Sequence, residues 1–371
     1  MAHGGASMTA LRPLLLAVGI FDWRYPLSDP VQQMAPHFLA AADVVFVAPV
    51  RRRTLDRRLA AELAGGIPPV FWRVTGHSPG GPIASPLSGR QLYLEMAGRP
   101  LVLYVNSYAA ELGGELVEML APDHLIYDVY EHVVSPDAPL AAAHGALWQA
   151  ATVRVALNER VAAAMTPLPP TLLAGAAVDP AHFEAAARHE GPYAYAFGFV
   201  GNFANWTDMA SLEAVAQRFP TERMLLVGPC PPTMAAQMGA LTALPNVDWR
   251  PPIPYADLPE VLRGVEVLLL PRTRQPAAEA SDPLKLYDYL ATGRPIVATP
   301  LPGAAPLPAG TVYWGVSGAP FADAADSALA EHRAHPRGAA AQGRIAVAHR
   351  RSWKARTQKI LAAAGLPPRE A

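Results

Sequence analysis

The sequence predicts an α/β fold made of two doubly wound, Rossmann-like domains that face a central cleft. Two series of short apolar runs alternate with helical stretches, one on each side of residues 183–195. Such alternation is typical of parallel sheets that carry helices on both faces. A chain of 371 residues is also long enough to build two separate cores. Ligands of such folds bind beyond the carboxyl ends of the strands, so the cleft is the expected functional region.

The first series predicts an N-terminal domain over residues 1–182. Its strand-like runs are residues 14–19, 44–48, 70–74, 101–105, 125–129, 153–157 and 172–174. Residues 183–195 (F-E-A-A-A-R-H-E-G-P-Y-A-Y) carry charge, Gly191 and Pro192, and are predicted to form the hinge.

The second series predicts a C-terminal domain over residues 196–337. Its strands are expected to start at Ala196 and to recur at residues 224–228, 246–249, 267–270 and 296–299. An Ala- and Arg-rich helical segment, residues 338–371, follows and is expected to pack back toward the N-terminal domain.

The composition excludes several classes of function. Hydrophobic residues make up 51% and charged residues 16% of the chain, which is typical of a globular protein, and the formal net charge of -1 gives no overall attraction to nucleic acid. A single cysteine, Cys230, excludes an internal disulfide and fits a reducing compartment. Apolar runs fall short of the ~18 residues that span a bilayer, and the first residues lack the features of a secretory signal. We therefore expect a soluble, cytoplasmic protein without a nucleic-acid partner.

Lys285 is unusual, because the chain has only three lysines against 27 arginines. It lies in the segment S-D-P-L-K-L-Y-D-Y-L-A-T-G-R-P-I-V-A-T, residues 281–299. Asp282 is expected to cap a helix with Pro283 at its first position, and Gly293 to end that helix. Lys285 would then lie in the first turn, where the positive end of the helix dipole disfavours a cation unless an anion is bound.

A phosphate or diphosphate would satisfy that helix start. Free backbone N–H groups of Leu284 and Lys285, together with the ammonium, would bind it. Asp288 lies one turn later on the same face and would accept hydrogen bonds from a ribose diol. An ordinary surface pair between Lys285 and Asp288 explains the same spacing equally well.

Five segments, in this order, resemble glycosyltransferases of the GT-B fold, in particular bacterial nucleotide-sugar enzymes of group 1. They are G-A-A-V-D-P-A-H-F (175–183), G-N-F-A-N-W-T-D (201–208), L-L-V-G-P (225–229), L-P-N-V-D-W-R-P-P-I-P (244–254) and P-L-K-L-Y-D-Y-L-A-T-G-R-P-I-V-A-T (283–299). The resemblance implies that Lys285 contacts the donor and that Asp288 holds its ribose.

The same resemblance implies roles for the neighbouring residues. The turn and helix start that approach the phosphates contain Ser281, Asp282 and Leu284, and Gly201 and Asn202 form the loop beneath them. Tyr255 or Pro254 is expected to border the base pocket.

The function that follows is transfer of a sugar from a nucleotide-sugar donor, UDP before GDP, to a hydroxyl of a glycan, glycolipid or other acceptor. The expected enzyme is of hexosyltransferase type and serves polysaccharide or glycoconjugate synthesis. It needs no cofactor and no metal, since helix amides and a cation stabilise the leaving diphosphate. An NDP-sugar epimerase on the same fold, or a degenerate sugar-nucleotide-binding protein without turnover, remains the alternative.

The stereochemical outcome stays open at this stage. Many retaining relatives carry two glutamates seven residues apart, and here the first position is Ala280, with Glu279 beside it. An inverting mechanism would need a base in the N-terminal domain. Asp128 is the first candidate and Asp22 the second, with Glu131 close to Asp128 in the sequence, and a structural role as a cap or loop anchor is as compatible with each.

A basic amphipathic stretch suggests a further partner. Arginines at positions 51, 52, 53, 57 and 58 (Arg51, Arg52, Arg53, Arg57 and Arg58) accompany apolar residues at helical spacing. Such a segment would dock on anionic lipid at the inner face of the membrane, although a solvated helix face explains it as well.

Overall fold

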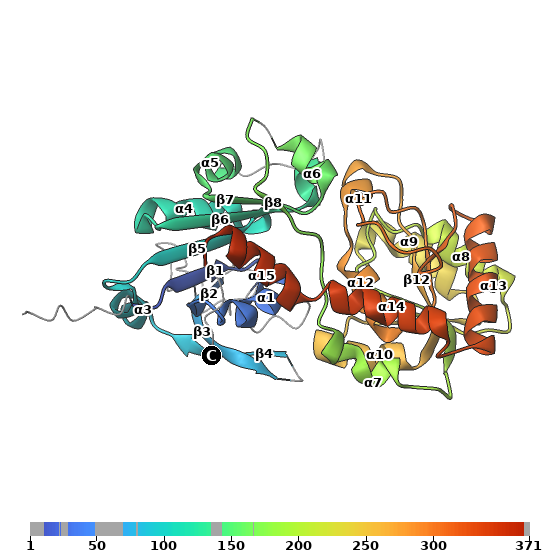
Figure 1. Cartoon of the computed structure of the whole chain (residues 1–371). Coiled ribbons are helices and arrows are strands. Elements are labelled where there is room, and N and C mark those ends of the chain that lie inside the picture. Colours follow the sequence, from blue (N-terminus) through green and yellow to red (C-terminus); the bar gives the residue numbers. More distant parts are fainter. Residues whose placement is uncertain are drawn as a thin grey trace, which may run out of the picture.

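The computed structural model describes residues 11–21, 23, 29–48, 70–78, 81–134, 143–165 and 167–366. In this part of the chain the secondary structure forms two separate sheets, each covered by helices (Figure 1). The predicted α/β fold with two Rossmann-like units is confirmed.

The N-terminal sheet has eight strands in the order β4-β3-β2-β1-β5-β6-β7-β8. The strands are β1 (Leu14–Val18), β2 (Asp43–Ala48), β3 (Val70–Ser78), β4 (Gly81–Leu87), β5 (Leu101–Asn106), β6 (His124–Val129), β7 (Val153–Ala156) and β8 (Leu172–Leu173). Their connections include α1 (Pro30–Phe38), α3 (Gly89–Met96), η1 (Ser107–Ala109), α4 (Ala110–Leu120), η2 (Glu131–Val134), α5 (Ala143–Ala150) and α6 (Glu159–Ala164).

The edge of this sheet differs from the all-parallel expectation. Strands β3 and β4 pair antiparallel with each other, and β3 pairs antiparallel with β2. Only residues 79 and 80 separate β3 from β4, which is too short for the crossover that a parallel pair needs. The hairpin therefore adds a strand that the apolar runs did not predict.

Burial on both faces explains the apolar character of the central strands. All five residues of β1 are buried, and they alternate between two cores. Leu15 and Ala17 face the core that contains α1, whereas Leu14, Leu16 and Val18 face the core beneath α4 and α5. A continuous apolar run is the sequence form of such a doubly covered strand.

The C-terminal sheet has six strands in the order β11-β10-β9-β12-β13-β14, and all its pairs are parallel. The strands are β9 (Tyr195–Val200), β10 (Met224–Val227), β11 (Val247–Arg250), β12 (Val265–Leu270), β13 (Ile296–Ala298) and β14 (Tyr313–Trp314). The helices are α8 (Met209–Arg218), η4 (Pro232–Met234), α9 (Ala235–Thr242), η5 (Tyr255–Asp257), α10 (Leu258–Arg263), α11 (Pro276–Ala280), α12 (Leu284–Thr292), α13 (Ala319–Ala334) and α14 (Ala339–Arg350).

The chain crosses between the two domains twice, and the crossings lie side by side. The first contains η3 (Pro180–Phe183) and α7 (Glu184–Ala187), and the second joins α14 to α15 (Trp353–Ala363). Val178 N donates to Arg351 O (3.0 Å) and Trp353 N donates to Val178 O (3.0 Å). Ala176 and Val178 already pack in a core of the C-terminal sheet, ahead of the predicted hinge at 183–195, and Phe183 at the start of that hinge packs in the same core.

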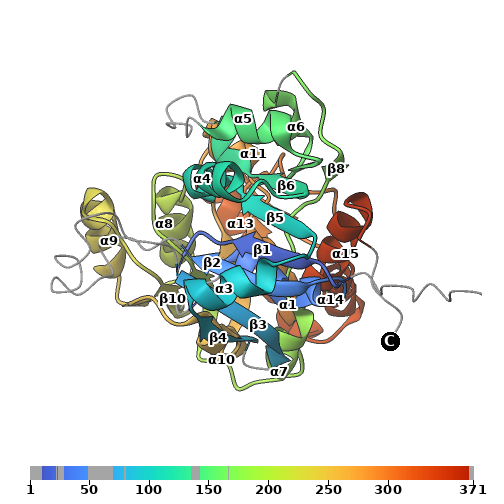
Figure 2. The ribbon, with the colours of Figure 1, turned by 90° about the vertical axis from the view of Figure 1, so that its left-hand side faces the viewer.

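Helix α15 returns to the N-terminal domain, where it lies against α1 (Figure 1, Figure 2). Its Trp353, Ile360 and Leu361 are buried in the same core as Leu15 and Phe38. The last helix in the sequence therefore completes the first domain of the fold.

Candidate donor and acceptor site

Gly201 and Lys285 are in direct contact at the end of β9. A β carbon on Gly201 would lie 1.8 Å from Lys285 Cε and 2.6 Å from its Nζ. Gly228 has φ of +139°, and a β carbon there would lie 2.0 Å from Gly201 O. At Gly228 only glycine fits, because φ is positive and the backbone of Gly201 is so close, whereas a side chain at Gly201 would displace the end of Lys285.

Lys285 is half-buried in the first turn of α12. Burial, and then the nearby Arg272 guanidinium, lower the pKa of Lys285 to about 8, against a smaller opposite effect of Asp288. Among the described residues no carboxylate oxygen lies within 4.0 Å of its Nζ, so the ordinary surface pair with Asp288 is not formed. The ammonium is thus buried beside another cation, an arrangement that an anionic ligand would stabilise.

The start of α12 corrects one local prediction. The helix begins at Leu284 with Pro283 at the N-cap, and no side chain caps it. Asp282 is 5% exposed and accepts hydrogen bonds from Ala176 N (2.8 Å) and Tyr287 Oη (2.7 Å) instead. Because the Asp282 carboxylate accepts from Ala176 and Tyr287, it does not cap α12. The first N–H groups of this helix therefore have no side-chain acceptor, as an anion site requires. Ser281 is buried, and Leu284 packs against cores of both domains.

Asp288, on the next turn of α12, forms a hydrogen bond with Tyr255 at the start of η5. Tyr255 Oη donates to Asp288 Oδ1 (3.1 Å), and Asp288 is 6% exposed. Burial raises the pKa of Asp288 to about 7, while the Tyr255 hydrogen bond and Lys285 act in the opposite direction. The two predicted nucleotide contacts are thus brought together, and their mutual hydrogen bond could not be predicted from their separate segments.

Arg272 is a site residue that sequence reasoning missed. It follows β12, and its backbone is fixed by Thr299, whose Oγ1 accepts from Arg272 N (2.8 Å) and donates to Arg272 O (2.9 Å). Its Nε is buried without a hydrogen-bond partner among the described residues, and burial lowers its pKa. The available signal was its position, since it is a cation two residues after the apolar strand β12, in the loop at the carboxyl end of that strand.

Asp128 is not placed as the predicted base. Its side chain is fully buried and receives Arg356 Nη2 (2.8 Å to Oδ2) and the hydroxyl of Tyr104. Arg356 lies on α15, 228 residues away, and also donates to Ala174 O and Gly175 O. A carboxylate enclosed in this way cannot reach an acceptor hydroxyl, so its role is structural.

Glu131 is the predicted carboxylate that faces the other domain. It begins η2, which packs against α11 of the C-terminal domain. Tyr108 Oη donates to its Oε1 (3.3 Å), and its charge acts on both Arg272 and Asp282. Burial raises its pKa, which suits a group that must take up a proton. Asp22 lies outside the described residues, and Asn202 is exposed in the loop after Gly201.

Ala280, the position where many retaining relatives carry the first glutamate, is tightly packed. Ala280 is 1% exposed, and a β carbon on Gly303 would lie 2.5 Å from its carbonyl carbon. Neighbouring Glu279 Oε1 accepts from Arg274 Nε (3.2 Å) and lines a separate cavity with Arg272 and Thr299.

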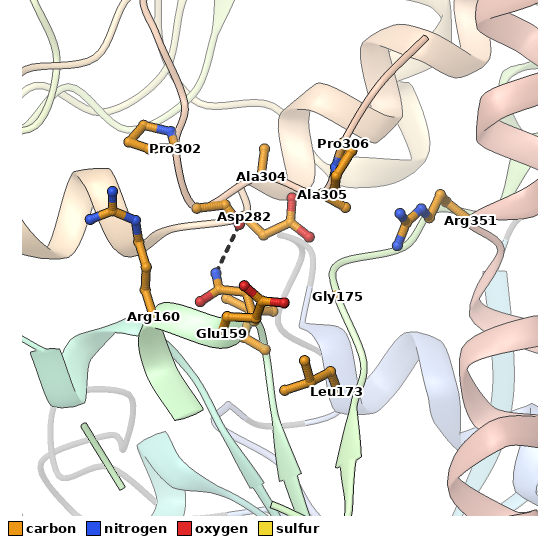
Figure 3. A pocket seen from close by; sticks show the side chains of 13 residues that line it. Glu159, Arg160, Leu173, Gly175, Asp282, Pro302, Ala304, Ala305, Pro306 and Arg351 are labelled. Atoms are coloured by element: carbon orange, nitrogen blue, oxygen red, sulfur yellow. Dashed lines mark hydrogen bonds between the residues drawn. The ribbon is translucent and has the colours of Figure 1, made fainter. Parts of the chain in front are cut away.

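A cavity of about 350 Å³ lies between the domains (Figure 3). Asp282 and residues 302–306 form its C-terminal wall, and residues 157–160, Leu173 and Gly175 form the N-terminal wall. Asn158 joins the two walls, because its Nδ2 donates to Ala280 O (2.7 Å) and Gly303 O (2.9 Å) while its Oδ1 caps α6 at Val161 N (3.0 Å).

The remaining predictions meet the structure only in part. The five arginines at positions 51–53, 57 and 58 lie outside the described residues. Of the helices that the structure describes, none is long and apolar enough to cross a bilayer. No three His, Cys, Asp or Glu side chains within the described ranges are grouped as metal ligands.

Comparison with known protein families matches the C-terminal domain. Residues 194–332 match the model of the family described as glycosyl transferases group 1. A protein of Bacillus subtilis named as a teichuronic acid biosynthesis glycosyltransferase, TuaH, is 31% identical over 121 residues, which are 33% of this chain and 30% of that relative. The aligned part is thus less than a third of either protein.

Solved structures match nearly the whole chain. Sucrose-phosphate synthase from Thermosynechococcus elongatus has a TM-score of 0.67 at 16% identity, covering 96% of this chain and 98% of that one. Anabaena Alr3699/HepE, solved with UDP and glucose, has a TM-score of 0.62 at 13% identity, covering 96% and 100%. At these identities the likeness establishes the fold. The match to the group 1 glycosyl transferases thus covers residues 194–332, less than half of the chain, and the chain as a whole has the GT-B fold.

Proposed function

We propose that this protein transfers a sugar from a nucleotide-sugar donor, a UDP-sugar, to a hydroxyl of a glycan, glycolipid or other glycoconjugate acceptor. The observation that carries the proposal is the contact of Lys285 with Gly201 beside Arg272. Two close cations at an uncapped helix start repel each other unless an anion neutralises them, and the donor diphosphate has the matching charge.

The rest of the donor fits around this point. Asp288, one turn further along α12, presents its carboxylate to the ribose while it accepts a hydrogen bond from Tyr255 of η5. Gly201 and Asn202 lie beneath the diphosphate, and Ser281, Asp282 and Leu284 shape the turn before it. One relative by fold, the Anabaena protein, is solved with UDP and glucose and again with UDP-glucose, which supports UDP over other nucleotides.

Glu131 is the proposed base that takes the acceptor proton. It projects from the N-terminal domain toward Arg272, whereas Asp128 is enclosed by Arg356. With Ala280 in place of the first glutamate, an inverting displacement assisted by Glu131 fits the residues better than one assisted by a carboxylate on α11. Analysis of the product anomer decides the outcome.

Ligand-dependent thermal unfolding tests the donor site. UDP, GDP, TDP and UDP-sugars are added in turn, and a ligand at about 100 times its Kd adds roughly 2.7 kcal/mol to the free energy of unfolding. UDP should stabilise the wild type but not Lys285→Ala. Lys359→Ala removes the same charge from an exposed position of α15, and UDP should still stabilise this variant. A wild type that no nucleotide stabilises contradicts the proposal.

Turnover separates an enzyme from a protein that only binds. Incubation with the stabilising UDP-sugar should release UDP slowly in the absence of acceptor and faster with a glycan or glycolipid acceptor. Interconversion of the sugar without UDP release would instead indicate an epimerase.

Contact with an anionic membrane surface through Arg51, Arg52, Arg53, Arg57 and Arg58 is a separate proposal. Co-sedimentation with vesicles containing anionic lipid tests it. The wild type should bind at low salt, and a variant with all five arginines replaced by glutamine should stay in the supernatant.

A further inference from the structure

The first crossing between the domains touches the donor site. Its short helix η3 begins after Asp179, whose Oδ1 accepts from Ala181 N (3.1 Å), and it packs against α12. The donor helix is therefore in contact with a segment that connects the two domains.

His182 of η3 contacts Tyr255 in two ways. The rings stack with centroids 4.7 Å apart and planes 23° apart. His182 Nε2 also lies 2.9 Å from Tyr255 O, so that its N–H donates to this carbonyl. One contact restrains the ring of Tyr255 and the other its backbone at the start of η5.

Phe183 packs against both rings of this contact. It is fully buried, and its ring lies edge-on to both His182 (4.9 Å) and Tyr255 (6.1 Å). Tyr255 is left with little freedom, and its hydroxyl donates to Asp288. The hydroxyl occupies one carboxylate oxygen and fixes the carboxylate plane, so the remaining lone pairs point in a defined direction.

We infer that His182 is a positioning residue for the donor ribose, holding Tyr255 so that its hydroxyl orients the Asp288 carboxylate toward the ribose diol. This inference rests on the proposed function. His182 touches neither the sugar nor the phosphates and acts only through Tyr255. Its effect should therefore be confined to ligands that possess the 2′- and 3′-hydroxyls.

The test compares UDP with 2′,3′-dideoxy-UDP by titration calorimetry. His182→Leu removes both the stack and the N–H donor, and His182→Phe keeps the stack alone. The Kd of UDP should rise roughly tenfold in His182→Leu and about threefold in His182→Phe, the size of one or two lost hydrogen bonds. The Kd of 2′,3′-dideoxy-UDP should stay within about twofold of the wild-type value.

A matched control exists in the same crossing. His189 also contacts a tyrosine, with its ring edge-on to Tyr193 (5.4 Å) and Nε2 3.3 Å from Pro192 O. His189→Leu should leave the Kd of both ligands unchanged. In turnover, His182→Leu should raise the donor KM and leave kcat near the wild-type value.

The outcomes separate this inference from the proposed function. If the wild type prefers UDP to its dideoxy analogue and His182→Leu keeps the same preference, or weakens both ligands equally, the inference about His182 is wrong and the donor site stands. If the wild type binds both ligands equally, Asp288 does not hold the ribose and the inference fails with it. If the wild type binds neither UDP, GDP nor TDP, the proposed function and the inference both fail.

Discussion

Lys285 and Asp288 carry opposite charges one turn apart on α12, and burial shifts the pKa of each toward neutrality. The pKa of Lys285 falls to about 8 and that of Asp288 rises to about 7. A carboxylate that accepts from a ribose diol must be ionised, and an ammonium that contacts a diphosphate must be protonated. Both conditions hold together only near neutral pH.

The affinity for the donor should therefore show a bell-shaped dependence on pH. The affinity for a UDP-sugar should rise as Asp288 ionises through about pH 7 and fall as Lys285 loses its proton through about pH 8. Titration calorimetry from about pH 5.5 to about pH 9.5, which brackets both pKa values, measures both limbs. Asp288→Asn should remove only the acid limb and Lys285→Arg only the alkaline limb. A flat profile in the wild type would contradict this assignment.

The two neighbouring carboxylates of the N-terminal domain should respond differently to amidation. Glu131→Gln should lower kcat by about 10²–10⁴-fold, the usual contribution of a general base, with little change in donor affinity. Steady-state kinetics and calorimetry on the same preparation separate these effects. Asp128→Asn should instead lower the melting temperature, since it weakens a buried ion pair. Full activity in Glu131→Gln would exclude it as the base.

Helix α15 shows how one element can belong to a domain far from it in the sequence. Its apolar face supplies Trp353, Ile360 and Leu361 to the N-terminal core. Its Arg356, 4% exposed, neutralises Asp128 and satisfies the carbonyls of Ala174 and Gly175. Apolar periodicity predicts that the segment is helical, but its partner is set by this buried ion pair.

Removal of one ion-pair partner should cost more than removal of both. Arg356→Leu leaves the Asp128 carboxylate buried and unpaired, which should cost about 3–5 kcal/mol of stability. Arg356→Leu combined with Asp128→Asn should recover part of this loss, because the asparagine oxygen can still accept from Tyr104. Calorimetric unfolding measures the transition, and Arg350→Ala, at an exposed position of α14, serves as the control. Equal losses in Arg356→Leu and in the double variant would show that the unpaired Asp128 carboxylate carries no penalty, contrary to this prediction.

The whole molecule is held together by two adjacent crossings and a small number of polar contacts across the cleft. Asn158 binds the carbonyls of Ala280 and Gly303, and Asp282 binds Ala176 N. Asn158, Gly303 and Asp282 line the interdomain cavity, and Asp282 directly precedes the N-cap of α12. Domain closure and the shape of the site are therefore linked through the same residues.

Asn158→Asp should loosen the closed arrangement without disturbing α6. The aspartate oxygen still accepts from Val161 N, but it has no N–H for the two carbonyls and repels both of them. We expect kcat to fall about tenfold or more, the size of one or two lost hydrogen bonds, together with a larger radius of gyration in small-angle scattering. Asn158→Ser, which keeps a cap without the charge, should have an intermediate effect. An unchanged radius with normal kcat would show that this contact does not control closure.

The sequence by itself determined the features that depend on near neighbours along the chain. Alternating apolar runs predicted both sheets, and the spacing of Lys285 and Asp288 predicted that they lie one turn apart on one helix, because strand burial and helix turns are local properties. The antiparallel β3–β4 hairpin and the true start of α12 were missed even so, since a short turn and a carboxylate recruited elsewhere override local preference.

Only the tertiary structure decided which polar side chains are free to act. Asp128 and Glu131 are three residues apart, yet Arg356 from the end of the chain encloses the first while the second faces Arg272. Which of these two carboxylates can act as a base depends on burial and on partners that are distant in the sequence. The spacing of nearby residues encodes neither the burial nor the partners. The same holds for His182, whose contact with Tyr255 exists because two segments 73 residues apart pack together.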